Sequence, residues 1–339
     1  ENCSFVGNGA DQGGAIFNTG MAAIYNSTFD GNNGTLDGGA IYSDLDSLFC
    51  FYNTFRNNDC GDFGGGIHIE SGGAKLEGNL FYQNGGSATS IDKTLSVNTG
   101  TLLTLGGNFI DSDVSTLTGI LPITGSDVMG SSLDPLLAGP VVDGYGLHYY
   151  VFASAFSPAI DIGNTSPGLE RDQRRGYRIM HGSSAYAADA GAIEYTPFCV
   201  TTTVGTPTGT GSAGVGTLGW ALDSANLSPN GPYSICFNLA GPGFAINATG
   251  TYTVIEDVII DGYTQPGSYV PGPADETPGL PTIPGNPLVQ LNGAAASGAG
   301  LVLAGINEVE VRGLSIFNFP DAGLVLTDSI AESLIEGNH

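Results

Sequence analysis

The chain has few basic residues. Its 339 residues include 8 Lys and Arg against 33 Asp and Glu, which gives a formal net charge of −25 at pH 7. A nucleic-acid-binding protein needs a basic face, so the composition excludes that class of function. An acidic surface either binds divalent cations or keeps a secreted protein soluble, and solubility is the favoured interpretation.

Metal-ligand spacings and long apolar runs are also missing. The five cysteines are Cys3, Cys50, Cys60, Cys199 and Cys236. None belongs to a Cys-x-x-Cys pair, and the four histidines are scattered, so the sequence predicts no zinc site. No apolar run is long enough to span a membrane. We predict no cofactor and no bound metal, with Ca²⁺ as the weaker alternative.

Two short phrases repeat through residues 1–84. Gly-Gly-Ala-Ile, or Gly-Gly-Ile, occurs three times with its isoleucines 25 and 26 residues apart, and Phe-x-x-Asn occurs four times at spacings of 24, 26 and 26. Two phrases that share one period are a strong repeat signal. The residues assigned a structural role in the repeat are Phe5, Asn8, Gly13, Ile16, Phe29, Asn32, Gly38, Ile41, Phe55, Asn58, Gly65, Ile67, Phe81 and Asn84.

The period and composition of the repeat predict a parallel β-helix. Short alternating runs of Thr, Phe, Ile and Tyr favour strands, and about 25 residues with two or three such runs form one coil. The Ile and Phe side chains should point inward and stack on their copies. Gly-Gly should provide a corner with positive φ or a close backbone approach. The Asn after each Phe should occupy a left-handed corner and bond to its copies.

The repeat resembles those of polymorphic outer-membrane proteins and related bacterial β-helical surface proteins, which are recognised by the same two phrases. The resemblance covers the first quarter of the chain. It implies an exported, surface-displayed β-helix and carries no catalytic residue with it.

A second group of motifs lies in residues 133–198. Residues 157–163 read Ser-Pro-Ala-Ile-Asp-Ile-Gly, residues 172–178 read Asp-Gln-Arg-Arg-Gly-Tyr-Arg, and residues 189–194 read Asp-Ala-Gly-Ala-Ile-Glu. This run resembles the terminal segment of bacterial choice-of-anchor surface proteins, with Arg175 as an extra residue in the middle motif. The resemblance implies the last coils of an extracellular β-helix.

Half of the basic residues lie in this terminal run, namely Arg171, Arg174, Arg175 and Arg178. Such a cluster could bind an acidic sugar or a phosphate. The acids of the same motifs, Asp161, Asp172, Asp189 and Glu194, offer internal partners instead. We favour internal pairing, because the acids and the bases belong to the same motifs.

A helical pattern follows the terminal run. In residues 217–226 the apolar residues Leu218, Ala221, Leu222 and Ala225 have helical spacing, which predicts a short helix that caps the core of a second β-helix. Residues 235–238 (Ile-Cys-Phe-Asn) and 260–267 (Ile-Asp-Gly-Tyr-Thr-Gln-Pro-Gly) resemble the start of another bacterial β-helix family. Regular coils return at the end of the chain, where Gly-Leu-Val-Leu at 300–303 recurs at 323–326.

The state of the cysteines is left open. Cys199 and Cys236 flank the predicted helix, and a disulfide that clamps this cap is one of two equal alternatives. For Cys3, Cys50 and Cys60, small buried thiols are as good an interpretation as disulfides. The odd count leaves at least one cysteine free or paired outside this segment.

Paired carboxylates are the candidate catalytic groups, since hydrolases on such folds need two of them at a set separation. The pairs are Asp44 with Asp46, Asp111 with Asp113, and Asp257 with Asp261. The i, i+2 spacing of the first two should point both carboxylates to one face of a strand. None has a basic residue nearby in sequence, so solvated turn aspartates are the favoured interpretation. A partner from another coil, or a metal, stays open.

The sequence therefore predicts an all-β chain of two right-handed parallel β-helices in tandem with a short capping helix. Residues 1–132 form the repeats, 133–198 the terminal coils of the first β-helix, and 199–339 the cap and first coils of the second. The first β-helix should end near residue 196 and the second begin near 218, with roughly 12 coils in all. The chain opens and stops inside a repeat, which indicates an excerpt of a longer protein.

The predicted function is structural or adhesive, as a segment of a stalk or filament on an extracellular bacterial surface such as the outer membrane. Its partners would be copies of itself, neighbouring surface proteins or glycans. A carbohydrate-active enzyme, either a polysaccharide lyase or a glycoside hydrolase, is the first alternative. A passive glycan- or calcium-binding module is the second.

Overall fold

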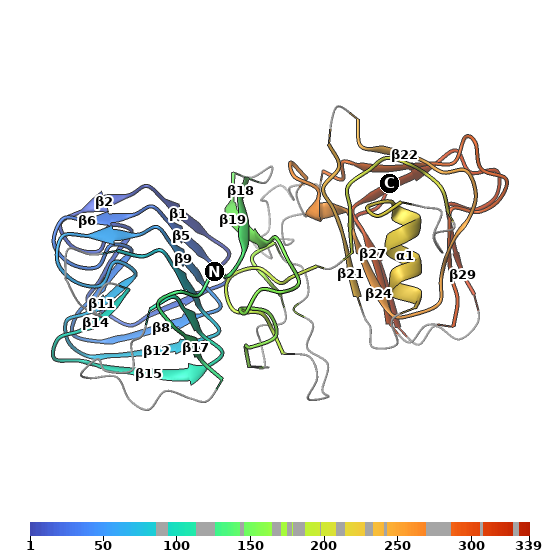
Figure 1. The fold of residues 1–339 in the computed structure, drawn as a ribbon. Helices are drawn as coiled ribbons and strands as arrows, with labels where there is room; N and C mark the ends of the chain where they lie inside the picture. Colours follow the sequence, from blue (N-terminus) through green and yellow to red (C-terminus); the bar gives the residue numbers. More distant parts are fainter. Residues whose placement is uncertain are drawn as a thin grey trace, which may run out of the picture. The chain divides into compact units, whose positions relative to one another are not determined.

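The computed structural model shows an all-β parallel β-solenoid of about 10 turns, with one short α-helix in the described part of the chain. The chain divides into two compact units, Glu1–Val141 with Leu147–Tyr195 and Val142–Gly146 with Thr196–His339 (Figure 1). The structure describes residues 1–85, 94–112, 126–142, 146–164, 171–174, 178, 187–196, 198–207, 214–227, 233–240, 243–268, 286–305, 308–327 and 332–339. Asp113 and Arg175 lie outside these residues.

Four parallel sheets form the walls of the first unit. Sheet A comprises β1 (Ser4–Val6), β5 (Thr28–Asp30), β9 (Thr54–Arg56), β13 (Leu80–Tyr82), β16 (Phe109–Ile110) and β17 (Val128–Met129). Sheet B comprises β2 (Gly9–Ala10), β6 (Asn33–Gly34) and β10 (Asp59–Cys60). Sheet C comprises β3 (Ile16–Asn18), β7 (Ile41–Ser43), β11 (Ile67–Ile69) and β14 (Leu95–Val97). Sheet D comprises β4 (Ala22–Tyr25), β8 (Ser47–Phe51), β12 (Gly73–Glu77) and β15 (Thr101–Gly106).

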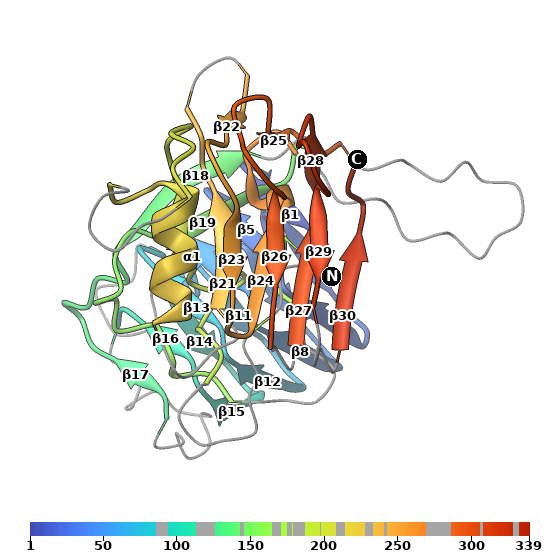
Figure 2. The same ribbon diagram turned by 90° about the vertical axis from the view of Figure 1, so that its right-hand side faces the viewer.

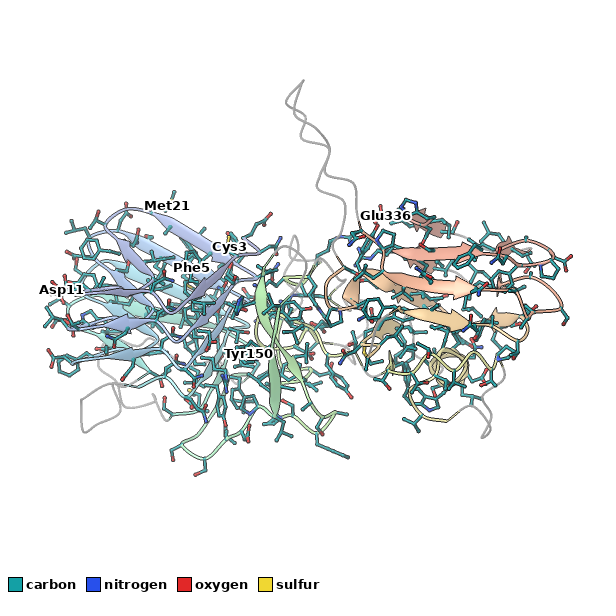
Figure 3. All side chains as sticks on the ribbon, turned by 90° about the horizontal axis from the view of Figure 1, so that it is seen from above. Cys3, Phe5, Asp11, Met21, Tyr150 and Glu336 are labelled. Carbon is teal, nitrogen blue, oxygen red and sulfur yellow. A yellow bond between two sulfur atoms is a disulfide. The ribbon has the colours of Figure 1, made fainter. Side chains whose placement is uncertain are left out.

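The core of the first unit is built from stacked copies of the repeat. Ile16, Ile41 and Ile67 are register partners on β3, β7 and β11. The Phe-x-x-Asn phenylalanines are register partners in sheet A, and their rings stack with centroids 4.8, 4.7 and 4.6 Å apart. These distances match the spacing of about 4.8 Å between neighbouring strands, so each coil places its aromatic side chain directly on that of the next. Phe5 begins this stack (Figure 3).

The two glycines of each corner have different tasks. Gly13, Gly38 and Gly64 have φ of 64°, 68° and 73°, which L-residues with a side chain rarely adopt. A Cβ on the following glycine would collide with the backbone carbonyl oxygen of the next coil, as at Gly14 against Gly39. In the third copy the residue equivalent to Gly13 and Gly38 is Gly64. Gly65 is equivalent to Gly14 and Gly39, and a Cβ there would collide with the carbonyl oxygen of Gly85.

The asparagine ladder forms, but these asparagines do not occupy the left-handed corner. The Nδ2 of Asn8, Asn32 and Asn58 donates to the Oδ1 of the next copy at 2.9, 2.8 and 2.9 Å, ending at Asn84. The left-handed residue is the one before each ladder position, for example Asn57 with φ of 53°. A left-handed residue turns the chain so that the following side chain points inward, where its amide satisfies buried backbone groups.

The described residues of 133–195 add no strand to sheets A to D. Their strands β18 (Leu137–Val142) and β19 (His148–Phe152) form a separate two-stranded sheet, and β19 lies beside β1 (Figure 1). None of the described residues from 153 to 195 forms a strand. Residues 133–195 are called the return segment, and described residues of this segment contact the outer side of sheet A. The terminal coils predicted for residues 133–198 are not seen in the described residues of 133–195.

Polar contacts fix the return segment to sheet A. Tyr150 donates its hydroxyl proton to Asp30 at 2.7 Å and accepts from Arg56 at 2.8 Å. Figure 3 labels Tyr150. Burial raises the pKa of Tyr150 to about 12, so its hydroxyl stays protonated and can donate. The Thr54 hydroxyl accepts from the backbone of Ala192 at 2.9 Å.

The second unit has three parallel sheets. A five-stranded sheet comprises β20 (Phe198–Val200), β21 (Tyr233–Phe237), β24 (Val258–Asp261), β27 (Glu308–Arg312) and β30 (Glu332–Glu336). Two three-stranded sheets comprise β22 (Ala245–Asn247), β25 (Val289–Asn292) and β28 (Leu314–Phe317), and β23 (Tyr252–Val254), β26 (Leu301–Leu303) and β29 (Leu324–Leu326). A 3-10 helix, η2 (Gly262–Thr264), follows β24. Leu301 and Leu324 of the repeated phrase are register partners.

The capping helix forms where the apolar spacing predicted it. Helix α1 (Leu218–Asn226) begins after Thr217, whose hydroxyl accepts from the backbone N–H of Trp220 at 3.1 Å. Its four predicted core residues, Leu218, Ala221, Leu222 and Ala225, all belong to the core of the second unit. The helix packs against β20, β21 and β23 (Figure 2). No helix in the described part of the chain has both the length and the apolar character needed to cross a membrane.

Candidate functional site

Two arginines of the basic cluster, Arg174 and Arg178, pair with acids of the return segment. Arg178 is 2% exposed and donates to the carboxylate of Glu194 at 3.1 Å, to the Oδ1 of Asn26 at 3.0 Å and to the carbonyl of Gly191 at 2.7 Å. Its guanidinium carbon lies 4.4 Å from the ring centroid of Tyr52. Asn26 and Tyr52 are left-handed corner residues of the solenoid, so Arg178 joins the return segment to this corner.

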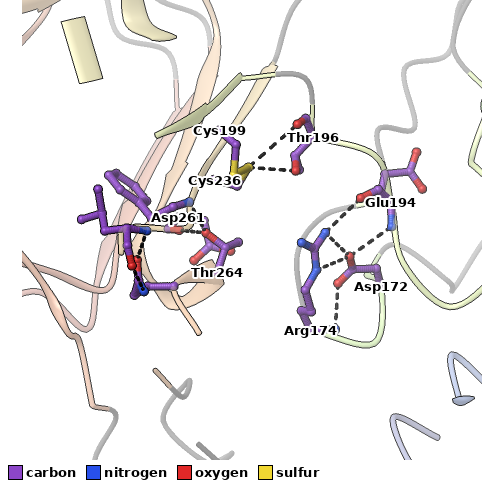
Figure 4. Close-up of a disulfide and its surroundings, with 11 residues drawn as sticks. Asp172, Arg174, Glu194, Thr196, Cys199, Cys236, Asp261 and Thr264 are labelled. Carbon is purple, nitrogen blue, oxygen red and sulfur yellow. Dashed lines mark hydrogen bonds and ion pairs between the residues drawn. A yellow bond between two sulfur atoms is a disulfide. The ribbon is translucent and has the colours of Figure 1, made fainter. Parts of the chain in front are cut away.

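Arg174 makes a second internal ion pair. Its Nε and Nη2 donate to the same carboxylate oxygen of Asp172 at 3.0 and 2.8 Å, and Nη2 also reaches the carbonyl of Glu194 at 2.9 Å (Figure 4). Asp172 is fully buried. Arg174 and Arg178 thus pair with acids of the same motifs. Neither guanidinium is exposed in a way that would let it bind a phosphate or an acidic sugar.

Two buried carboxylates lie next to each other in this cluster. Asp189 accepts from the backbone N–H groups of Asp161 and Tyr195 at 2.9 and 2.5 Å, and the backbone N–H of Asp189 donates to Glu194 at 3.2 Å. Burial raises the pKa of both carboxyl groups, with Asp189 reaching about 7. Their mutual repulsion adds to the rise at Glu194. The Asp189 carboxylate accepts from backbone N–H groups of its own segment, so it helps to hold the return segment together.

The second unit has an equivalent buried ionic group. Arg312 is 1% exposed, and its Nη2 lies 2.5 Å from Asp261 while its Nε lies 3.2 Å from Glu310. Asp261 and Arg312 are register partners on β24 and β27. The next coil therefore supplies the base that the sequence around Asp261 lacks. Asp261 also accepts from the backbone N–H of Tyr263 at 3.0 Å, which fixes the turn after β24.

The other two carboxylate pairs do not form a reactive arrangement in the described residues. Asp44 and Asp46 lie in the turn between β7 and β8, where the N–H of Asp46 donates to the carbonyl of Asp44 at 3.1 Å. They are not on one face of a strand, so that expectation was wrong. Asp111 follows β16 and accepts from the backbone of Gln83 at 2.6 Å, while burial raises its pKa. Its predicted partner, Asp113, is not described.

One disulfide is present. Cys199 and Cys236 are register partners on β20 and β21, with Cα atoms 4.4 Å apart, and are bonded (Figure 4). The bond closes the loop that contains α1. Cys50 and Cys60 are buried free thiols and Cys3 is an exposed one. Burial raises the pKa of Cys60 to about 12, so this thiol stays protonated and unreactive at neutral pH.

A surface feature that the sequence interpretation missed is the outer face of sheet D. On β8 the inward side chains Leu48 and Cys50 are fully buried, while the outward Phe49 and Phe51 are half-buried. The sheet D face comprises the outward side chains Tyr25, Phe49, Phe51, Lys75, Glu77, Leu103 and Leu105. Glu77 is 6% exposed, whereas Lys75 is exposed. The available signal was that residues 48–51 are apolar at every position, although an exposed wall strand should alternate.

The described residues contain no group of three or more His, Cys, Asp and Glu side chains that could hold a metal ion. Comparison of the chain with protein-family models, with curated proteins and with solved structures found no match.

Proposed function

We propose that the chain is a structural and adhesive segment of an extracellular surface protein, and that it does not turn over polysaccharide. The observation that carries the proposal is the continuity of its side-chain ladders. The stacked phenylalanines and the Asn8 to Asn84 ladder join the first four coils to one another. A solenoid held together in this way is a stiff spacer whose length grows by about 4.8 Å with each coil.

The ionisable groups and the disulfide also support a structural role. Arg174, Arg178 and Arg312 all pair with buried acids that also bind the backbone. The Cys199–Cys236 disulfide suits an oxidising, extracellular compartment. The solenoid fold is equally compatible with carbohydrate-active proteins, so the experiment has to separate adhesion from turnover.

Beads coated with the purified chain should adhere under flow to at least one of a set of bacterial, plant and animal cell surfaces. Beads coated with albumin are the reference. In parallel, incubation with pectin, alginate and other polysaccharides, with and without Ca²⁺, should release neither reducing ends nor unsaturated uronates. Adhesion no better than that of albumin on every surface would overturn the proposal. If products are released, and the double variant Asp44→Asn, Asp46→Asn abolishes their release, the enzymatic function replaces the proposed one.

A further inference from the structure

The sheet D face has more apolar side chains than a solvated wall requires. Its outward row across the four strands runs Ala23, Phe49, Lys75 and Leu103, as the parallel registers define. The rings of Phe49 and Phe51 lie edge to face with centroids 6.3 Å apart, and Tyr25 lies 5.5 Å from Phe51. None of these three aromatic side chains belongs to a hydrophobic core cluster. They therefore form a separate apolar patch on the outside of the wall.

The only basic side chain of this face is Lys75, which is exposed. Its Nζ lies 5.7 Å from the ring centroid of Phe49. Arg56, Arg174, Arg178 and Arg312 each lie within 4 Å of a carboxylate. Lys75, in contrast, makes no ion pair with any carboxylate of the described residues. A positive charge beside an aromatic patch is thus available to an anionic ligand.

We propose that the sheet D face binds an acidic glycan, one whose sugar rings carry carboxylates, as uronates do. The negative faces of Tyr25, Phe49 and Phe51 attract the polarised C–H groups on one side of a pyranose ring. Lys75 pairs with the sugar carboxylate. Four strands at about 4.8 Å give a face roughly 14 Å wide, enough for two or three sugar units laid across the strands. This inference rests on the proposed adhesive function and names the ligand class for it.

Charge favours this occupant over a second copy of the chain or a neutral glycan. The sheet D face of a second copy carries no exposed carboxylate that could pair with Lys75. A neutral glycan would leave the ammonium group of Lys75 without a counter-charge. The repulsion between the whole chain and an acidic glycan is screened beyond about 8 Å at physiological ionic strength, so the contact at Lys75 decides the binding.

The test measures binding of fluorescent tetragalacturonate and of its methyl ester to the purified full chain, with tetramers of mannuronate and glucuronate alongside. Lys75→Gln and Phe49→Ser should each weaken binding of the best acidic tetramer at least tenfold. Lys75→Arg should retain binding, because it keeps the charge and the contact with Phe49. Phe17→Ser is the matched control, because Phe17 is a 55%-exposed aromatic on sheet C. Thermal melts establish that each variant is folded.

Three outcomes would overturn the inference. The first is binding of the methyl ester as tight as that of the acid, which assigns the face to neutral glycans. The second is no binding of any acidic tetramer, or binding that Lys75→Gln leaves unchanged. The third is a concentration-dependent dimer that Phe49→Ser dissociates, which assigns the face to a second copy. If the coated beads still adhere to cells in any of these cases, the proposed function stands and only this ligand assignment fails.

Discussion

Arg312 donates to Asp261 at 2.5 Å although the two residues are 51 positions apart in the chain. They meet because β24 and β27 are neighbouring coils in register. Both side chains are buried. The attraction between the two charges therefore offsets the free energy lost when each is removed from water. Arg178 and Glu194 form a buried pair of the same kind in the first unit.

Removing one partner of this pair should be severe. Arg312→Ala leaves the buried carboxylates of Asp261 and Glu310 without their counter-charge, and should lower the free energy of unfolding by about 3–5 kcal/mol. Lys75→Ala, which removes an exposed cation, should change it by less than about 0.5 kcal/mol. Urea unfolding at pH 7 measures both. Similar losses for the two variants would contradict the buried-pair interpretation.

The asparagine ladder offers a comparison between neighbouring residues. Asn58 is fully buried, bonds to Asn32, Asn84 and the carbonyl of Phe29, and its loss leaves several buried polar groups unpaired. Asn58→Ala should therefore cost at least about 3 kcal/mol. Asn57 is left-handed with φ of 53°, so Asn57→Gly should cost less than about 1 kcal/mol. Thermal and urea unfolding test this order, and a smaller cost at Asn58 than at Asn57 would reject the ladder's role.

The capping helix can be tested through its buried face. Leu222 is 2% exposed in the core of the second unit. Leu222→Asp should cost several kcal/mol, on the order of 4, because it buries a carboxylate among apolar side chains. Leu227→Ser is the control, since Leu227 is 74% exposed just beyond the helix. A change below about 0.5 kcal/mol for Leu222→Asp would mean that the helix does not cover the core.

The first unit should become less stable as the pH rises from about 4 to about 7. The folded-state pKa of Asp189 is raised from 3.8 to about 7 by burial, so over this interval the folded chain holds a proton that the unfolded chain has released. The free energy of unfolding therefore falls with rising pH, by up to a few kcal/mol.

Urea unfolding at a series of pH values measures this slope, and carbon-13 NMR of the Asp189 carboxyl group follows its titration directly. Asp189→Asn should be less stable than the wild type at low pH, because the amide group would face a backbone N–H donor. Its free energy of unfolding should also change less with pH, because the variant lacks the titrating carboxyl group. A wild-type stability that rises steadily between pH 4 and pH 7 would contradict the raised pKa.

Much of the scaffold follows from the sequence because it repeats. Copies of Phe29 and Ile41 at one period can be buried together only if each coil lies on the previous one, and that geometry is the same at every step. The helical spacing of Leu218, Ala221 and Leu222 is likewise a local pattern, and it predicted α1 correctly. The tandem arrangement of two β-helices stays a prediction.

Only the tertiary structure decided which side chains from different coils and segments meet. The return segment carries no repeat, so no period could reveal that it folds back onto sheet A and brings Arg178 to Asn26, 152 residues earlier in the chain. The sheet D face likewise depends on which side chains of β8 point inward. Residues 48–51 are all apolar, so no alternation of polar and apolar residues predicts which of them face the core. By itself the sequence determined the stacked core, because burial of apolar side chains at a regular period is a local property. The partners of the buried charges and the exposed aromatic face depended on contacts between coils, which are long-range and follow no sequence period.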